Sequence, residues 1–336
     1  MREYLLSPDV VRVTVVTSVI LSVLFYERVQ LTSGGAIVPG YLALGLVAPV
    51  HVVTTLLSAL VTYFVVEKLL TRRRILYGRR RFEIELLVGL AFVLGGTLAA
   101  TLLQGWSPAL VGLAGIGFLV PGLMAHDMAR QGPWRTLAAV GATTAMLGVF
   151  VYLFVRLTDA VPQPEDEPVH LASVLGYPRE LIVIAAAVSV LVSMVAYARW
   201  GLRCGGFITG TYVALVAPRW QDLMFLVVVA ALTYLVVVKL LMPRLLLFGR
   251  RKLSTMILVG SILSWAGEML LVHLTDGAYL PWRGLTVITL MCPALVANDL
   301  ERQGWERTAW GLLLAATGVF AAANLMAALA QHLGWI

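Results

Sequence analysis

Charged residues are scarce in this chain of 336 amino acids. Asp, Glu, Lys and Arg make up 13% of it, whereas 60% of the residues are hydrophobic and the mean hydropathy is +0.89. A soluble domain has about 25% charged residues, because its surface must face water. The composition therefore excludes a soluble enzyme, a secreted disulfide scaffold and a disordered chain. It predicts an all-α protein that crosses a membrane several times.

The sequence also lacks the motifs of nucleotide and metal chemistry. It has no GxxxxGK[ST] loop, no HExxH and no Cys/His cluster, and its two cysteines, Cys204 and Cys292, have no CxxC spacing. The glycine-rich string at 112–117 lies in an apolar run, which is typical of close helix packing rather than dinucleotide binding. We therefore expect this chain to bind no cofactor and no metal, and whether it is an enzyme stays open.

Comparison of the chain with itself indicates a tandem duplication. Residues 26–35 recur at 197–206, and the segment GRRR at 78–81 recurs as GRRK at 249–252. The segment DMARQG at 127–132 returns as DLERQG at 299–304. A proline-rich acidic stretch separates the copies and is typical of a solvated linker. The predicted organisation is a first membrane repeat at 1–158, a linker at 159–178 and a second repeat at 179–336.

Each copy has four apolar runs long enough to cross about 30 Å of hydrocarbon. They cover residues 10–27, 50–70, 84–104 and 136–157 in the first copy, and 181–200, 222–242, 254–274 and 309–330 in the second. Each copy also has two short runs, which in the first copy lie at 36–45 and 115–124 and are broken by Gly and Pro. Each short run is predicted to be a re-entrant half-helix or a bent span, buried in protein or lining a cavity.

The basic loops predict the orientation. Six arginines lie within residues 72–81, between two long runs, and 244–252 is the corresponding basic loop of the second copy. The positive-inside rule places both loops in the cytoplasm. The two repeats are then parallel, so each has an even number of crossings, four or six. Six crossings per repeat would also place Arg130 and Arg135 on the cytoplasmic side and the acidic linker on the outer side, which suits the charge pattern better.

The Pro-Gly breaks are candidate binding positions for an anionic substrate or polymer. Interrupted helices can present bare N–H groups and a positive dipole at the middle of the membrane. The alternative is that each proline only kinks a packed helix. The second copy has Gly210-Thr211 in place of the first break and only Pro293 at the second, so the first copy is the better candidate. The candidate residues are Pro39, Gly40, Tyr41, Pro121 and Gly122.

Two polar sets complete the candidates. Asp127, Arg130 and Gln131 follow the second break, and the spacing of Asp127 and Arg130 lets them pair on one helix face. The basic loops are candidates for binding anionic lipids, an acidic partner or a polyanionic product, and their alternative role is to determine topology only. The basic candidates are Arg72, Arg73, Arg74, Arg79, Arg80, Arg81, Arg250, Arg251 and Lys252.

These residues, in this order, resemble the CapC/PgsC family of membrane proteins of poly-γ-glutamate capsule synthesis. The resemblance rests on the segments GGAIVPGYL at 34–42, ILYGRRRF at 75–82 and GIGFLVPGL at 115–123, followed by Arg130-Gln131-Gly132. It covers residues 26–155 well. The second copy matches in the basic loop and at Arg302-Gln303-Gly304 but departs at both Pro-Gly breaks. Familiar members are single units, so this chain resembles a fused pair.

The resemblance implies a subunit of a synthesis and export complex in the bacterial cell membrane. A soluble ATP-dependent amide ligase, similar to the Mur ligases and carrying ATP and Mg²⁺, would make the polymer, and this chain would anchor it and help the polymer across. An additional membrane-anchored extracellular subunit, anionic lipids and oligomerisation are further expected partners, and nucleic acid is not. Two alternatives stay open, a secondary transporter or channel for a small acidic solute and a purely structural anchor.

Overall fold

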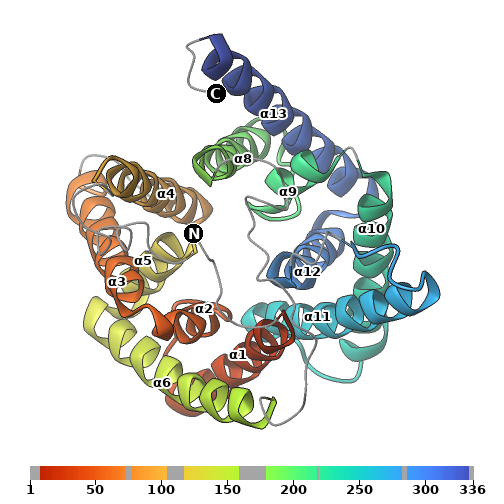
Figure 1. The fold of residues 1–336 in the computed structure, drawn as a ribbon, viewed down its shortest axis with the longest axis horizontal. Helices are drawn as coiled ribbons and strands as arrows, with labels where there is room; N and C mark the ends of the chain where they lie inside the picture. Colours follow the sequence, from red (N-terminus) through yellow and green to blue (C-terminus); the bar gives the residue numbers. More distant parts are fainter. Residues whose placement is uncertain are drawn as a thin grey trace. The chain divides into compact units, whose positions relative to one another are not determined.

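The computed structural model describes residues 8–72, 78–103, 117–158, 179–217, 219–281 and 286–332. All regular structure in these ranges is helical, which confirms the predicted all-α class. The chain divides into two compact units, Met1–His170 (unit 1) and Leu171–Ile336 (unit 2) (Figure 1). The predicted linker at 159–178 lies outside the described residues, so the domain boundaries stay predictions.

Unit 1 contains long and short helices in its described part. The long ones are α1 (Pro8–Val29), α3 (Pro49–Phe64), α4 (Gly78–Leu103) and α6 (Pro133–Thr158). The short ones are α2 (Val38–Leu44), which continues into a 3₁₀ turn (Gly45–Val47), and α5 (Val120–Gln131). A π-helical turn (Val65–Leu70) extends α3. In Figure 1, α2 packs on α1 and α6, whereas α5 packs on α3, α4 and α6.

Unit 2 repeats this order in its described part. Its helices are α8 (Arg179–Trp200), α9 (Thr209–Val216), α10 (Trp220–Tyr234) with a π-helical turn (Leu235–Leu241), α11 (Gly249–Leu274), α12 (Thr286–Gln303) and α13 (Trp305–His332). α9 packs on α8 and α13, and α12 packs on α10, α11 and α13. The helix contacts of unit 2 therefore correspond to those of unit 1. Unlike α5, α12 continues through its proline, Pro293.

Eight segments of the described chain are long and apolar enough to cross a membrane, four in each unit. They are Val10–Val29, Pro49–Leu70, Gly78–Ala100, Pro133–Arg156, Ile182–Trp200, Trp220–Leu241, Gly249–Leu274 and Trp305–Met326. The chain is a multi-pass membrane protein, as predicted. α4 begins six residues before the apolar run predicted from 84, because Arg79 and Arg81 form i,i+4 ion pairs that support its first turns.

The outer face of the long helices is apolar and exposed. On α3, Val53, Leu57, Val61 and Phe64 follow helical spacing and are each more than 40% exposed, as expected of a face that meets lipid tails. Buried threonines turn their hydroxyls back to the helix, as in the 2.9 Å hydrogen bond from Thr97 to the Val93 carbonyl. Such a hydroxyl is thus bonded within its own helix, as a solvent without hydrogen bonds requires.

The contacts of the short helices favour six crossings for unit 1. Thr32 bonds Gln131, the last residue of α5, two residues before α6 begins, whereas a Cβ at Gly148 of α6 would lie 2.6 Å from Leu46. Gly148 lies 15 residues beyond Pro133, or about 22 Å along the helix. The segment carrying α2 therefore runs along most of a span instead of returning to its own side. α4 and α5 are antiparallel, since Gly122 contacts Gly89 and His126 contacts Glu85.

Candidate functional site

The first predicted break lies at the start of α2. Pro39 occupies one of the first two positions of the helix, where its missing N–H costs no helical hydrogen bond. The Gly40 N–H donates to Ser18 Oγ on α1 at 2.9 Å, and a Cβ at Gly40 would lie 2.9 Å from the Ser18 Cβ. At Gly40, the N–H group expected to face an anion is therefore bonded within the unit.

The second break lies at the start of α5 and forms a backbone contact with α4. A Cβ at Gly122 would lie 2.7 Å from the Leu86 Cα, and a Cβ at Gly89 would lie 2.7 Å from the Gly122 N. The glycines thus allow α4 and α5 to touch through their backbones. Both breaks have a packing role in the structure, which is the alternative that the sequence left open. Whether they also contact polymer stays a prediction.

The structure brings the two breaks into one apolar cluster. Val38 and Leu42 of α2 pack with Val120, Met124 and Met128 of α5 in this buried group. Tyr41 packs against the same cluster, and its Cδ1 would lie 3.4 Å from a Cβ at Gly117. The two short helices, about 80 residues apart in the chain, therefore share one core.

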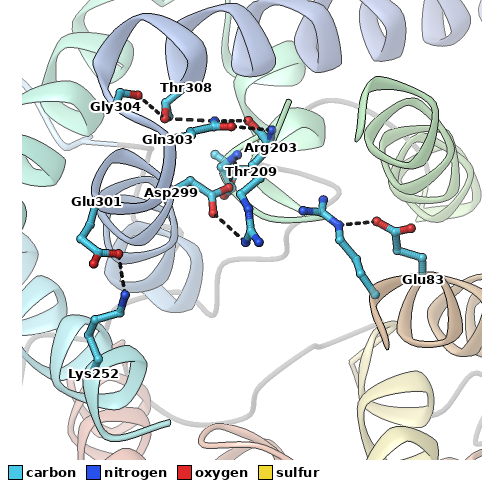
Figure 2. Close-up of polar contacts among 11 residues, drawn as sticks. Glu83, Arg203, Thr209, Lys252, Asp299, Glu301, Gln303, Gly304 and Thr308 are labelled. Carbon is cyan, nitrogen blue, oxygen red and sulfur yellow. Dashed lines mark hydrogen bonds and ion pairs between the residues drawn. The ribbon is translucent and has the colours of Figure 1, made fainter. Parts of the chain in front are cut away.

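A glutamine at the end of α5 holds the extended segment after α1. Oε1 of Gln131 accepts the Thr32 N–H at 2.8 Å, and its Nε2 donates to the Thr32 carbonyl at 2.7 Å. In unit 2, Gln303 bonds the N–H and carbonyl of Arg203 at 2.8 and 2.7 Å (Figure 2). We call this contact the glutamine clamp. It satisfies non-helical backbone within the protein, and it makes Thr32 and Arg203 equivalent positions.

Replacement of the clamp glutamine tests its structural role. Thr32 is 7% exposed, so Gln131→Ala leaves a buried N–H and a buried carbonyl without their partner, and each costs about 1–3 kcal/mol. We expect Gln131→Ala to lower the free energy of unfolding by about 2–4 kcal/mol, measured by tryptophan fluorescence of the purified protein in detergent. Gln221→Ala, at an exposed position of α10, is the control. Equal stability of the two variants would contradict the clamp.

Two buried carboxylates lie at the start of α4. Glu83 is 2% exposed and accepts a 2.6 Å hydrogen bond from Arg79 Nε. Glu85 is 1% exposed, and its Oε1 accepts from Arg81 Nε at 3.0 Å. The other carboxylate oxygen of Glu85 lies 2.7 Å from His126 Nδ1 on α5.

The same pairs extend to α3. Arg81 also donates to Glu67 in the π-helical turn that ends α3, and the Phe82 ring contacts the His126 ring edge to face at 4.7 Å. Glu67, Arg81, Glu85 and His126 therefore form one connected set that joins α3, α4 and α5 at the basic loop. The pair of Arg79 and Glu83 lies beside this set on α4. We call these six residues the unit 1 ion network.

Unit 2 lacks most of this network. Its residues at the positions of Glu67, Glu83, Glu85 and His126 are Val238, Ser254, Met256 and Asn298. Lys252, at the position of Arg81, instead pairs with Glu301 at 2.5 Å (Figure 2). Since a buried ion network is costly and unit 2 folds without these carboxylates, the presence of the network in unit 1 points to a role beyond stability.

The basic candidates differ in their exposure. Arg79, Arg81 and Lys252 form the ion pairs described above. Arg72, Arg80 and Arg251 are exposed and Arg250 is half-buried, while Arg73 and Arg74 lie outside the described residues. The ion network therefore holds two arginines of the loop in place, and Arg72 and Arg80 present charge to the outside of unit 1.

The predicted pair of Asp127 and Arg130 does not form within the described residues. Asp127 is 5% exposed, whereas Arg130 is exposed. In unit 2, the equivalent Asp299 accepts the Gly205 N–H at 3.0 Å and lies 3.7 Å from the Arg203 guanidinium (Figure 2). Asp299 thus faces the segment after the first helix of unit 2.

Unit 2 has a second polar contact, in the first turn of α10. Asp222 is fully buried, accepts a 2.5 Å hydrogen bond from the Tyr279 hydroxyl and lies 3.4 Å from the Arg219 guanidinium. Burial and the Asp222 carboxylate raise the pKa of the Tyr279 hydroxyl above its usual value. Tyr279 therefore stays neutral and donates its hydrogen bond across the physiological pH range.

Sequence reasoning missed Glu67, Glu83, Glu85 and the partner of His126. One signal was available, because Arg79 and Glu83, like Arg81 and Glu85, have the i,i+4 spacing of helical ion pairs. The contacts from Glu85 to His126 and from Arg81 to Glu67 depend on tertiary packing and leave no local signal. Within the described ranges, no group of three or more His, Cys, Asp and Glu is arranged to hold a metal ion.

Comparison with known proteins gives the family. The sequence model described as capsule biosynthesis CapC matches residues 17–137 and 188–309, one segment in each unit. The chain belongs to the CapC family. Both clamp glutamines, Gln131 and Gln303, fall within the matched segments. The two matches fit the predicted tandem duplication.

Two curated relatives have the length of one unit. The chain is 35% identical over 148 residues to the PGA biosynthesis protein CapC of Bacillus subtilis (strain 168), and 35% identical over 146 residues to the capsule biosynthesis protein CapC of Bacillus anthracis. Each comparison covers 95% of the relative but only 43% and 42% of this chain. This CapC-family chain is therefore about twice as long as these relatives. No solved structure matches it.

Proposed function

We propose that this CapC-family chain is a membrane subunit of a poly-γ-glutamate synthesis and export complex in the bacterial cell membrane. Similarity to the PGA biosynthesis protein CapC of B. subtilis supports the polymer, and eight apolar spans support the location. A soluble Mur-ligase-like enzyme, with ATP and Mg²⁺, makes the polymer. The CapC-family chain anchors this ligase at the bilayer and assists passage of the anionic product.

One observation carries the proposal, the ordered basic end of unit 1. Each residue of a γ-linked polyglutamate bears a carboxylate, which costs several kcal/mol at the centre of a bilayer. Arg72 and Arg80 are exposed beside Arg79 and Arg81, whose orientation the unit 1 ion network holds. With the basic loops in the cytoplasm, this surface gathers the polyanion or an acidic face of the ligase.

The long spans contain few basic residues, so further subunits complete a path for the polymer. Other copies of this chain and a membrane-anchored extracellular subunit are the proposed partners. Anionic lipid headgroups bind the same basic loops at about 1 kcal/mol per arginine.

Co-expression with a ligase from a neighbouring gene tests the proposal. We expect γ-linked polymer in the culture and co-purification of the ligase with the membrane chain. The double variant Arg72→Glu, Arg80→Glu should lower the polymer yield about tenfold or more, because it reverses a charge that concentrates a polyanion. Arg302→Glu, at an exposed position of α12, is the control and should retain the yield.

Three outcomes would contradict this function. Uptake of glutamate into liposomes by the chain alone, without polymer or ligase binding, would favour a secondary transporter. Full polymer yield from the charge-reversed double variant, with the ligase still bound, would reduce the chain to a structural anchor. If cells without this chain form the polymer equally well, the chain has no role in polymer synthesis.

A further inference from the structure

Asp127 in unit 1 is a buried carboxylate without a partner among the described residues. It is 5% exposed, and its Oδ2 has no hydrogen-bond donor there. The hydroxyl of Thr32, 7% exposed, also lacks a partner in the described chain. More than nine-tenths of buried polar groups are hydrogen-bonded in folded proteins, and an unpaired buried charge is strongly destabilising. The Asp127 carboxylate and the Thr32 hydroxyl are therefore available to accept hydrogen bonds from a ligand.

The two groups face the same place. Along α5, Met124 lies beside Gly34, with its Cγ 3.0 Å from the position of a Cβ, and Gln131 holds Thr32 through the glutamine clamp. Asp127 lies three residues after Met124 and four before Gln131, so all three share one helix face. The Asp127 side chain is therefore directed at the segment 32–34.

Unit 2 shows which group this position accepts. Asp299 there receives the Gly205 N–H and lies 3.7 Å from the guanidinium of Arg203 (Figure 2). The clamp makes Arg203 the counterpart of Thr32. Unit 2 thus neutralises its aspartate with a cationic nitrogen from its own chain, whereas unit 1 has a short hydroxyl at the same position.

We propose that Asp127 and Thr32 of unit 1 bind the ammonium group of an amino acid or peptide, and that Arg203 closes the equivalent position in unit 2. An ammonium has three donors and needs few acceptors. A divalent metal requires about six oxygen ligands, and the described residues contain no acidic cluster for one.

The inference rests on the proposed function and names the part of the polymer that is recognised. A γ-linked polyglutamate has many carboxylates but one ammonium, at its amino terminus. His126 and Glu85 place Asp127 at the basic-loop end of unit 1. The arginines there hold the carboxylates, and Asp127 holds the amino terminus, so the chain enters in one direction.

Calorimetric titration of the purified full-length chain in detergent tests the site. The probes are a short γ-linked oligoglutamate with a free amino terminus, the same oligomer N-acetylated, and free glutamate. We expect acetylation to weaken binding about tenfold or more, because it removes the charge that pairs with Asp127. Tighter binding of the oligomer than of glutamate identifies the polymer end as the source of the ammonium, and the reverse identifies the monomer.

Variants taken from the chain itself make the test specific. Asp127→Asn and Thr32→Arg, which copies unit 2, should each abolish the preference for the free amine, whereas Asp299→Asn should keep it. Arg203→Thr should raise the number of oligomer molecules bound per chain from one to two. This gain of binding keeps the proposal testable if a loss-of-binding variant fails to fold.

Equal binding of the free and acetylated oligomers would overturn the site, and so would displacement of the oligomer at Asp127 by sodium or potassium alone. If polymer synthesis in co-expression persists in either case, only the ammonium site is lost and the proposed function stands. If ammonium binding depends on Asp127 but the co-expressed cells make no polymer, the site stands and the proposed function fails.

Discussion

Gly311→Ala is expected to destabilise unit 2 by about 3 kcal/mol or more, at the upper end for an overpacked position. Gly311 lies in α13, and a Cβ there would lie 2.1 Å from the Arg203 carbonyl oxygen and 2.9 Å from its carbon. Both atoms are backbone, and the glutamine clamp bonds the N–H and the same carbonyl oxygen of this residue. The segment cannot yield without breaking the clamp. Tryptophan fluorescence in detergent should show a melting temperature lower by about 6–12 °C.

Gly141→Ala is the matched control for this variant. Gly141 lies in α6, the unit 1 counterpart of α13, and no atom lies within 4 Å of its added Cβ. Because alanine is the better helix former, this change should raise stability by about 0.5–1 kcal/mol. If the two alanine variants melt at the same temperature, the close approach of α13 to residue 203 is wrong.

Glu85→Ala is expected to cost about 3–5 kcal/mol, the usual result of removing one partner from a buried ion pair. Glu85 is 1% exposed and bonds Arg81 and His126 through separate carboxylate oxygens. Its removal leaves His126 without its carboxylate and Arg81 with Glu67 only. Urea unfolding of the purified protein in detergent measures the loss. Glu306→Ala, at an exposed position in the first turn of α13, should cost at most about 1 kcal/mol.

A combined variant separates structural from functional roles of the network. Unit 2 folds without it, so exchange of the whole group should recover most of the stability lost in Glu85→Ala. Polymer yield in co-expression should still fall about tenfold or more, since Arg79 and Arg80 lose their support. Full yield would show a purely structural network. The substitutions copy unit 2 and are Glu67→Val, Arg81→Lys, Glu83→Ser, Glu85→Met, His126→Asn and Ala129→Glu.

The helices of this protein could be predicted because a lipid solvent imposes their length and composition. The run predicted at 50–70 is found as Pro49–Leu70, and that predicted at 181–200 as Ile182–Trp200. The prolines of the short runs were equally informative, since Pro39 and Pro121 each lie in the first two positions of a helix. The sequence left four or six crossings per repeat open, with six suiting the charge pattern better, and the course of the α2 segment along α6 favours six in unit 1.

The site residues were less predictable, because their partners lie far away in the chain. Gln131 was a candidate from its recurrence, but its partner Thr32 is 99 residues distant. Spacing predicted that Asp127 would pair with Arg130, whereas packing buries the first and exposes the second. Which face of α5 is buried depends on α3, α4 and α6 together, and no local pattern records it.

The loss of Glu85 and His126 counterparts from unit 2 has an evolutionary meaning. A single-unit relative that assembles from identical copies cannot change a residue in one copy without changing it in all. Fusion removes that restriction, because each half accumulates mutations separately while the number of halves stays fixed at two. Met256, Asn298 and Arg203 mark positions where the two halves of this chain already differ from Glu85, His126 and Thr32, so a fused chain can carry different chemistry in its two halves.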